Sequence, residues 1–171
     1  FNIRKLYSSL RSIRRVRSGI KNYRWHLREM QNRLWLRNNL AREIPKGPYL
    51  LFYLSHLPEA TTFTQAPRWA YPEAIVEQLA INAPTNLRIV VKEHPNTYGR
   101  RGRSFFKPLL DLPNVVVCDP RVDNFALVSN SAAIITVTGT VGLEGIVLGK
   151  RVGVLGRPYY AIYKGISELN F

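Results

Sequence analysis

The stretch TVTGT, residues 136–140, has the residue types of an anion-binding turn before a helix. Gly139 lets backbone N–H groups approach a ligand closely, and Thr138 and Thr140 add hydroxyl donors. The helix expected to begin here contributes the partial positive charge of its N-terminus. Together these groups suit a phosphate. A structural alternative stays open, in which one of the two threonines only caps the helix.

Glu144 lies one turn into the same predicted helix. A carboxylate at that position can accept hydrogen bonds from the hydroxyls of a sugar or a ribose. The alternative is that Glu144 only complements the helix dipole.

His94 and Pro95 begin a second polar stretch, directly after an apolar run. A residue before proline is held in an extended conformation, which turns the histidine outward, where a ring N–H can bind phosphate. Further polar residues are expected at the same edge of the fold, namely His56, Glu59, Lys92, Glu93 and Ser131. Each has a structural alternative: the first two order their own loop, the lysine is a solvated strand end, and the serine ends a helix.

Alternating strands and helices must position these residues. Buried strands are predicted over Tyr49–Ser55, Leu87–Lys92, Val115–Cys118, Ala132–Val137 and Arg151–Leu155. Helices are predicted over Tyr71–Ile81, Phe105–Leu110, Asn124–Ser129 and Val141–Leu148, the last of which Gly149 ends. This order predicts an α/β fold with a Rossmann-like parallel sheet of about five strands. Ligands of such sheets bind beyond the carboxyl ends of the strands, which gathers the candidate residues into one cleft.

Composition limits the kinds of site and the compartment. The 171 residues are 46% hydrophobic, enough for one full core and an appendage. The single cysteine, Cys118, excludes an intramolecular disulfide and fits a reducing cytoplasm, and no Cys/His spacing indicates a metal. No apolar run approaches ~20 residues, so no membrane span is predicted. Because the chain begins with Phe1, it is expected to be a fragment of a longer protein.

The net charge of +14 is concentrated in residues 1–46, which hold 13 Lys and Arg against two glutamates. Apolar residues recur there at spacings of three and four, which predicts a basic amphipathic helical segment before a Rossmann-like domain over 47–171. Packing on another domain, nucleic-acid binding and binding to anionic lipid are all open roles. Nucleic acid is disfavoured, because no base-stacking platform accompanies the arginines. A membrane surface would be contacted through arginines such as Arg11, Arg14, Arg15 and Arg17.

Several stretches together resemble the bacterial capsule polysaccharide synthesis proteins: FYLSHLPEATT, VVKEHPNTYGRR, Asp123 before a helix, and TVTGTVGLEGIVLGKRVGVLG with a following Tyr-Tyr. The match runs from about Tyr49 to Tyr160. It departs from the commoner family pattern at Leu57 and Gly145. Characterised members are Kdo transferases that use CMP-Kdo, and the resemblance implies the nucleotide-binding, C-terminal half of a two-domain GT-B glycosyltransferase.

The resemblance also implies roles for residues and partners. In related CMP-sugar transferases a His-Pro motif and a Ser/Thr turn hold the CMP phosphate, which implies His94-Pro95 and Thr138-Gly139-Thr140 here, with Glu144 near the ribose. The implied donor is a CMP-sugar such as CMP-Kdo, and the implied acceptor is a glycolipid or polysaccharide. The expected place is the cytoplasm, peripheral on the inner face of the cell membrane. No metal or cofactor is expected, and the general base is expected in an amino-terminal half.

Two other functions stay open. One is a polyol-phosphate transferase or sugar-nucleotide epimerase of the same architecture, in which a similar histidine and Gly-Ser/Thr turn hold phosphate. The other is a non-enzymatic module that binds membrane or nucleic acid through the arginine-rich helix. A linker is predicted at Pro45-Lys46-Gly47-Pro48. The 171 residues by themselves are expected to transfer no sugar, because only a helix precedes this linker.

Overall fold

The computed structural model describes residues 22–55, 69 and 71–169. A helix over 22–39, here called the N-terminal helix, comes first. The elements after it are β1 (Tyr49–Tyr53), α3 (Pro72–Asn82), β2 (Arg88–Lys92), the 3-10 turn η2 (Pro95–Thr97), α4 (Arg103–Leu110), β3 (Val115–Cys118), α5 (Asn124–Asn130), β4 (Ala133–Thr136), α6 (Val141–Val147), β5 (Arg151–Val154) and β6 (Ile166–Glu168). Each strand and helix predicted from residue 49 onward is present, with its ends displaced by two residues at most.

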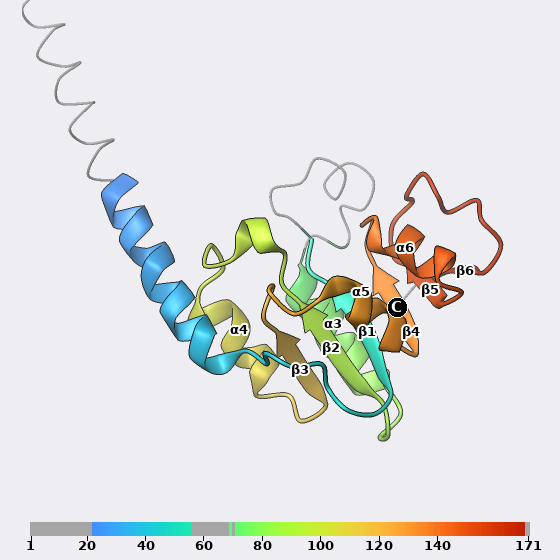
Figure 1. Cartoon of the computed structure of the whole chain (residues 1–171), viewed down its shortest axis with the longest axis horizontal. Coiled ribbons are helices and arrows are strands. Elements are labelled where there is room, and N and C mark those ends of the chain that lie inside the picture. Colours follow the sequence, from blue (N-terminus) through green and yellow to red (C-terminus); the bar gives the residue numbers. More distant parts are fainter. Residues whose placement is uncertain (1–21, 56–68, 70, 170–171) are drawn as a thin grey trace, which may run out of the picture.

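The six strands form one parallel sheet in the order β3-β2-β1-β4-β5-β6 (Figure 1). The chain fills the sheet outward from β1 to β3 and then returns to place β4 on the other side of β1. The strand order therefore reverses between β1 and β4, where Leu50 pairs with Ala133 and Phe52 with Ile135. Ligands of open α/β sheets bind in the crevice beyond the carboxyl ends of strands at such a reversal.

The sixth strand, β6, was not predicted. It has three residues, Ile166–Glu168, two of which are exposed, and its Ile166 pairs with Val152 of β5. A short edge strand has neither the apolar run nor the clear alternation that sequence analysis uses. The parallel sheet expected from the sequence is therefore confirmed, and it has six strands where about five were predicted.

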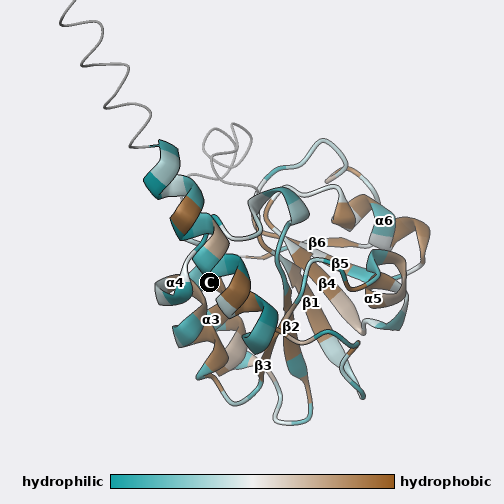
Figure 2. Cartoon of the chain, turned by 60° about the vertical axis from the view of Figure 1, so that its left-hand side comes forward, coloured by the Kyte–Doolittle hydropathy of each residue, from teal (hydrophilic) through white to brown (hydrophobic). Residues whose placement is uncertain are grey.

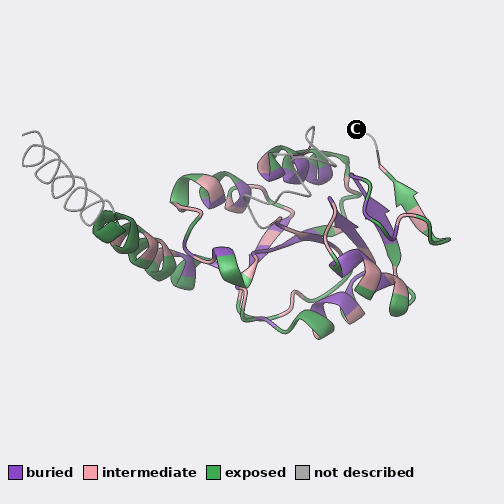
Figure 3. Cartoon of the chain, turned by 90° about the horizontal axis from the view of Figure 1, so that it is seen from above, coloured by how far each residue is buried: buried purple, intermediate pink, exposed green. Residues whose placement is uncertain are grey.

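Helices cover both faces of the sheet. Alternate residues of β1 point to opposite sides, so Phe52 and Leu54 enter one buried cluster while Tyr49 and Leu51 enter the other. The first cluster lies under α3, α4 and the end of the N-terminal helix, and the second lies under α5 and α6 (Figure 3). Burial on both faces explains why the central strands read as continuous apolar runs.

The hydrophobic core begins before residue 47, where the sequence placed the start of the domain. Leu36 is fully buried and Leu40 nearly so, both in the cluster beneath α3 and α4. Ala41 donates its N–H to the carbonyl of Val117 and accepts the N–H of Asp119, which covers the outer edge of β3. The end of the N-terminal helix is thus part of the body. The division into segments 1–46 and 47–171 otherwise stays a prediction, since residues 1–21 lie outside the described range.

Gly149, just after α6, and Gly145, within it, set how this helix ends and how close it lies to the sheet. Gly149 ends the helix as predicted, with φ +67° and with Lys150 N–H donating to the Gly145 carbonyl at 2.8 Å. A Cβ on Gly145 would lie 2.4 Å from the Ile134 side chain of β4. The helix can therefore approach β4 closely, which fixes the position of the turn before it.

Candidate functional site

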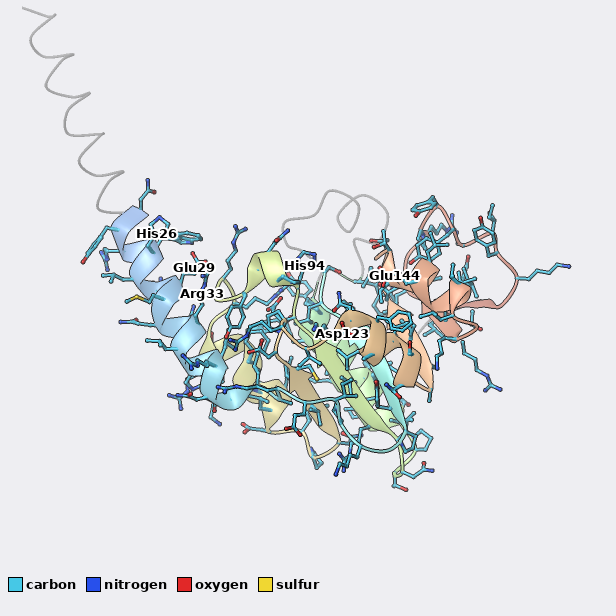
Figure 4. The ribbon with its side chains drawn as sticks, viewed as in Figure 1. His26, Glu29, Arg33, His94, Asp123 and Glu144 are labelled. Atoms are coloured by element: carbon cyan, nitrogen blue, oxygen red, sulfur yellow. The ribbon has the colours of Figure 1, made fainter. Side chains whose placement is uncertain are left out.

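A cavity of about 540 Å³ opens beyond the carboxyl ends of β1, β2 and β4, at the reversal of strand order. His94 from the loop after β2 and Glu144 from α6 reach it from two sides (Figure 4). The lining residues are Tyr53, Leu54, Ser55, His94, Pro95, Asn96, Asn124, Thr136, Thr138, Gly139, Thr140, Val141, Glu144, Pro158 and Tyr159.

The cavity brings together part of the predicted site. His94, Pro95, Thr138, Gly139, Thr140 and Glu144 all line it, although 42 residues lie between Pro95 and Thr138. Three other predicted residues do not line it: Lys92, Glu93 and Ser131. The remaining predictions fall outside the described residues, namely His56, Glu59, Arg11, Arg14, Arg15 and Arg17.

His94 is oriented by its own loop. Its backbone is extended (φ −75°, ψ 133°), as expected before Pro95, which begins η2. The ring Nδ1 accepts the backbone N–H of Asn96 at 3.1 Å. Because Nδ1 acts as an acceptor, a neutral imidazole carries its proton on Nε2. The ring that lines the cavity therefore has an N–H donor of the kind that a phosphate oxygen accepts.

Glu93 is buried under this loop, and its predicted place in the cleft is wrong. Its Oε1 accepts the backbone N–H of His94 at 2.8 Å, the hydroxyl of Thr97 at 2.5 Å and the guanidinium of Arg101 at 2.6 Å. Arg101 also donates to the carbonyl of Ser55 at 2.5 Å. This buried ion pair joins the loop after β2 to the end of β1, so Glu93 holds His94 in place and does not itself line the cavity.

Lys92 and Ser131 are also internal. Side chains alternate along a strand, and Lys92 points to the face that α5 and α6 cover, where its Nζ donates to the carbonyls of Asp119 (3.2 Å) and Val122. Burial lowers the pKa of Lys92. The hydroxyl of Ser131 donates to the carbonyl of Val128 at 2.8 Å. The structure thus favours the structural alternative for Ser131, which follows the last residue of α5. Lys92 is fully buried, so it is neither a cleft residue nor the solvated strand end that was its alternative.

The turn between β4 and α6 is braced by two hydroxyl groups. The hydroxyl of Thr136 accepts the N–H of Gly139 at 3.0 Å, and the hydroxyl of Tyr160 donates to the Gly139 carbonyl. A Cβ at position 139 would lie 2.8 Å from Thr136 Oγ1, so a glycine is required there. The N–H of Gly139 is therefore already hydrogen-bonded within the turn. Burial raises the pKa of Tyr160 to about 12, which keeps its hydroxyl a donor.

The side-chain hydroxyl of Thr138, in the same turn, differs from those of Thr136 and Tyr160. Its Oγ1 is buried and makes no hydrogen bond within the described part of the chain. A buried hydroxyl in that state costs about 1–3 kcal/mol. Thr140 occupies the N-cap position of α6 without a side-chain capping bond. Neither threonine therefore caps the helix through its side chain, and a ligand oxygen in the cavity would give Thr138 the partner it lacks.

Tyr53 and Asn124 line the cavity but were not predicted. The hydroxyl of Tyr53 donates to Oδ1 of Asn124 at 3.0 Å, and Asn124 follows the N-cap residue of α5, Asp123. Burial raises the pKa of Tyr53, and the nearby Glu144 carboxylate adds to the shift. Tyr53 is the last residue of β1, so the rule about strand ends could have found it. It was hidden in the apolar run YLLFY.

The described lining of the cavity includes no lysine or arginine, and Glu144 is its one carboxylate. The three arginines that follow η2, Arg100, Arg101 and Arg103, lie elsewhere. Arg101 is paired with Glu93, while Arg100 and Arg103 approach the rings of Trp25 and Trp35 on the N-terminal helix. Within the described ranges, no group of three or more His, Cys, Asp or Glu is placed to hold a metal ion.

The sequence profile of the capsule polysaccharide biosynthesis protein family matches residues 65–169, more than half of the chain. The chain belongs to this family. The matched range includes His94-Pro95, the 138–140 turn and Glu144. Among curated proteins, the chain is similar to the capsule polysaccharide modification protein LipB of Neisseria meningitidis, in serogroups A and B. The two sequences are 25% identical over 77% of this chain. The chain spans about a third of LipB, 34% of its length.

Solved structures with the same fold include two of KpsC from Thermosulfurimonas dismutans. The beta Kdo 2,7 transferase has a TM-score of 0.59 at 19% identity and covers 84% of this chain and 45% of that one. The beta Kdo 2,4 transferase has a TM-score of 0.57 at 20% identity, with coverages of 81% and 46%. The UDP-GlcNAc 2-epimerase of Methanocaldococcus jannaschii has a TM-score of 0.51 at 19% identity, with coverages of 82% and 41%. These likenesses show a shared α/β architecture, that of one half of each larger protein.

Proposed function

We propose that this capsule family member is the nucleotide-binding half of a glycosyltransferase, and that its cavity binds a CMP-sugar donor such as CMP-Kdo. The observation that carries the proposal is the buried hydroxyl of Thr138, which has no hydrogen-bond partner among the described residues and lies in the same cavity as the ring of His94. One phosphate group has enough oxygens to accept from both. Family membership and the fold shared with structures named as Kdo transferases support this donor class.

The chemistry follows from the donors in the cavity. When the sugar leaves, negative charge grows on the CMP phosphate, and preorganised hydrogen-bond donors stabilise that charge. His94 Nε2–H and the Thr138 hydroxyl supply two donors in the cavity, and the bond from Asn96 orients the His94 ring. The Glu144 carboxylate at the rim accepts hydrogen bonds from the ribose hydroxyls.

The acceptor site and the general base are expected in parts of the protein outside this chain. The acceptor, a glycolipid or polysaccharide, needs a general base to deprotonate its hydroxyl. The chain covers less than half of the Kdo transferase structures it resembles. We therefore expect the 171 residues to bind donor nucleotide in the cytoplasm, at the inner face of the membrane, without turning it over.

Replacing Thr138 with valine tests the phosphate site. Valine keeps the shape and removes the unpartnered hydroxyl, so the melting temperature of the free protein is expected to rise. The CMP affinity is expected to fall about ten- to a hundredfold, the value of a hydrogen bond to a charged group. Calorimetric titration and thermal denaturation measure the two effects. A lower melting temperature with unchanged CMP affinity would show that the hydroxyl has a structural partner and no ligand role.

Replacing Glu144 with glutamine tests the ribose contact separately. The amide keeps the shape and one acceptor but loses the charge that strengthens a hydrogen bond to a hydroxyl. CMP and cytidine are both expected to bind several-fold more weakly, with the ratio of their affinities unchanged. Equal binding by this variant and the unaltered chain would mean that Glu144 serves only the dipole of α6.

A panel of nucleotides separates the donor classes. A ligand present at 100 times its dissociation constant stabilises a protein by about 2.7 kcal/mol. Stabilisation by CMP supports the proposal. Stabilisation by UDP or CDP in place of CMP would favour the epimerase or polyol-phosphate transferase classes, and the fold shared with a UDP-GlcNAc 2-epimerase makes UDP the most informative competitor.

A further inference from the structure

One side of the N-terminal helix packs on the body of the protein. Asn32 Nδ2 donates to the carbonyl of Gly99 at 2.9 Å, and Arg33 Nε donates to the carbonyl of Tyr98 at 3.1 Å. One turn further on, Leu36 is fully buried. These contacts fix the rotation of the helix about its axis. They therefore also determine which residues face away from the body.

The opposite side carries a stripe of apolar residues. Tyr23, Leu27, Met30 and Leu34 follow one another at spacings of four, three and four, which places them on one face of a helix. At 100° per residue, that face lies opposite Asn32. The exposed fractions are 65% for Tyr23, 54% for Met30 and 58% for Leu34. The helix projects beyond the body, with apolar and polar residues interleaved along it (Figures 2 and 3).

Charge indicates what covers this stripe. The helix carries four arginines and one glutamate over 22–39, a net charge of +3, and its Glu29 is paired with Arg33. Arg24 and Arg37 flank the stripe, and neither forms an ion pair with any other described residue. A second copy of the chain would bring the same positive charge against it. A surface with negative charge is complementary.

We propose that this stripe docks on an anionic lipid bilayer, with the helix lying in the plane of the surface. Apolar side chains enter the boundary between headgroups and acyl chains, while arginines keep their guanidinium groups at the phosphates. In the described part of the chain no helix has the length and apolar character needed to cross a bilayer, so the contact is made at the surface. The inference does not depend on the proposed nucleotide site.

Co-sedimentation of the full chain with vesicles tests the proposal. Vesicles of phosphatidylcholine with 30% phosphatidylglycerol are compared with phosphatidylcholine alone, each at about 50 and 500 mM salt. Binding is expected to the anionic vesicles at low salt. The double variant Arg24→Gln, Arg37→Gln should lower the partition coefficient about fivefold per arginine, from about 1 kcal/mol for each basic side chain at such a surface. The double variant Met30→Gln, Leu34→Gln should lower it about tenfold or more.

Matched substitutions outside the stripe control for general effects. Ile81→Gln removes an apolar side chain that is 74% exposed on α3, and the double variant Arg88→Gln, Arg151→Gln removes two exposed arginines. Both are expected to bind vesicles like the unaltered chain. The proposal is overturned if the stripe variants also bind normally, or if neutral and anionic vesicles bind equally. It is also overturned if the chain is dimeric and the stripe variants make it monomeric.

Discussion

Replacing Glu93 with alanine is expected to cost about 3–5 kcal/mol of unfolding free energy, because it leaves a buried arginine without its carboxylate. The side chain of Glu93 is fully buried and that of Arg101 is 10% exposed, with 2.6 Å between the paired atoms. Small domains are stable by about 5–15 kcal/mol, so this variant should unfold at much lower urea concentration or temperature. Denaturation followed by circular dichroism measures the loss.

Asp111→Ala is the matched control for Glu93→Ala. Lys107 and Asp111 form an ion pair at 2.8 Å with both side chains more than half exposed, and such pairs contribute at most about 1 kcal/mol. The milder variant Glu93→Gln keeps an acceptor for the backbone N–H of His94. It is expected to fold and to bind CMP more weakly than Asp111→Ala does. A loss near 1 kcal/mol for both alanine variants would disprove the structural role of the buried pair.

Replacing His94 with alanine is expected to weaken CMP binding about ten- to a hundredfold, the loss of one hydrogen bond to a charged group. Its ring lines the cavity, and the bond from Asn96 to Nδ1 assigns the donor proton to Nε2. Because the lost partner is the phosphate, cytidine affinity should change little. Calorimetric titration with CMP and cytidine measures the difference between the two ligands.

His26→Ala is the control for His94→Ala, since it makes the same chemical change on the exposed N-terminal helix, away from the cavity (Figure 4). It should leave both affinities unaltered. If His94→Ala lowers the melting temperature and CMP still binds normally, the histidine orders its loop and does not hold a phosphate. Equal losses for CMP and cytidine would place the ring at the nucleoside instead.

Residues 92–94 show how far the sequence could predict the site. The end of an apolar run followed by His-Pro correctly located the strand end, but three consecutive side chains there have three different surroundings. Lys92 points into the core under α5, Glu93 pairs with Arg101, and His94 lines the cavity. The partner of Glu93 lies eight residues later, beyond η2, so its burial depends on a chain reversal that no local pattern specifies.

Local patterns in the sequence predict the alternation of strands and helices, the parallel sheet and the place of the Gly/Thr turn at its carboxyl edge. These features depend on apolar periodicity and on glycine and proline, which act over a few neighbouring residues. Three other features are visible only in the folded chain: Leu36 belongs to the core, Tyr53 lines the cavity and the Tyr160 hydroxyl donates to the Gly139 carbonyl. A fourth is the buried hydroxyl of Thr138, which has no hydrogen-bond partner among the described residues. Burial and hydrogen bonding of this kind are set by segments far apart in the chain, and they exist only once the sheet has brought those segments together.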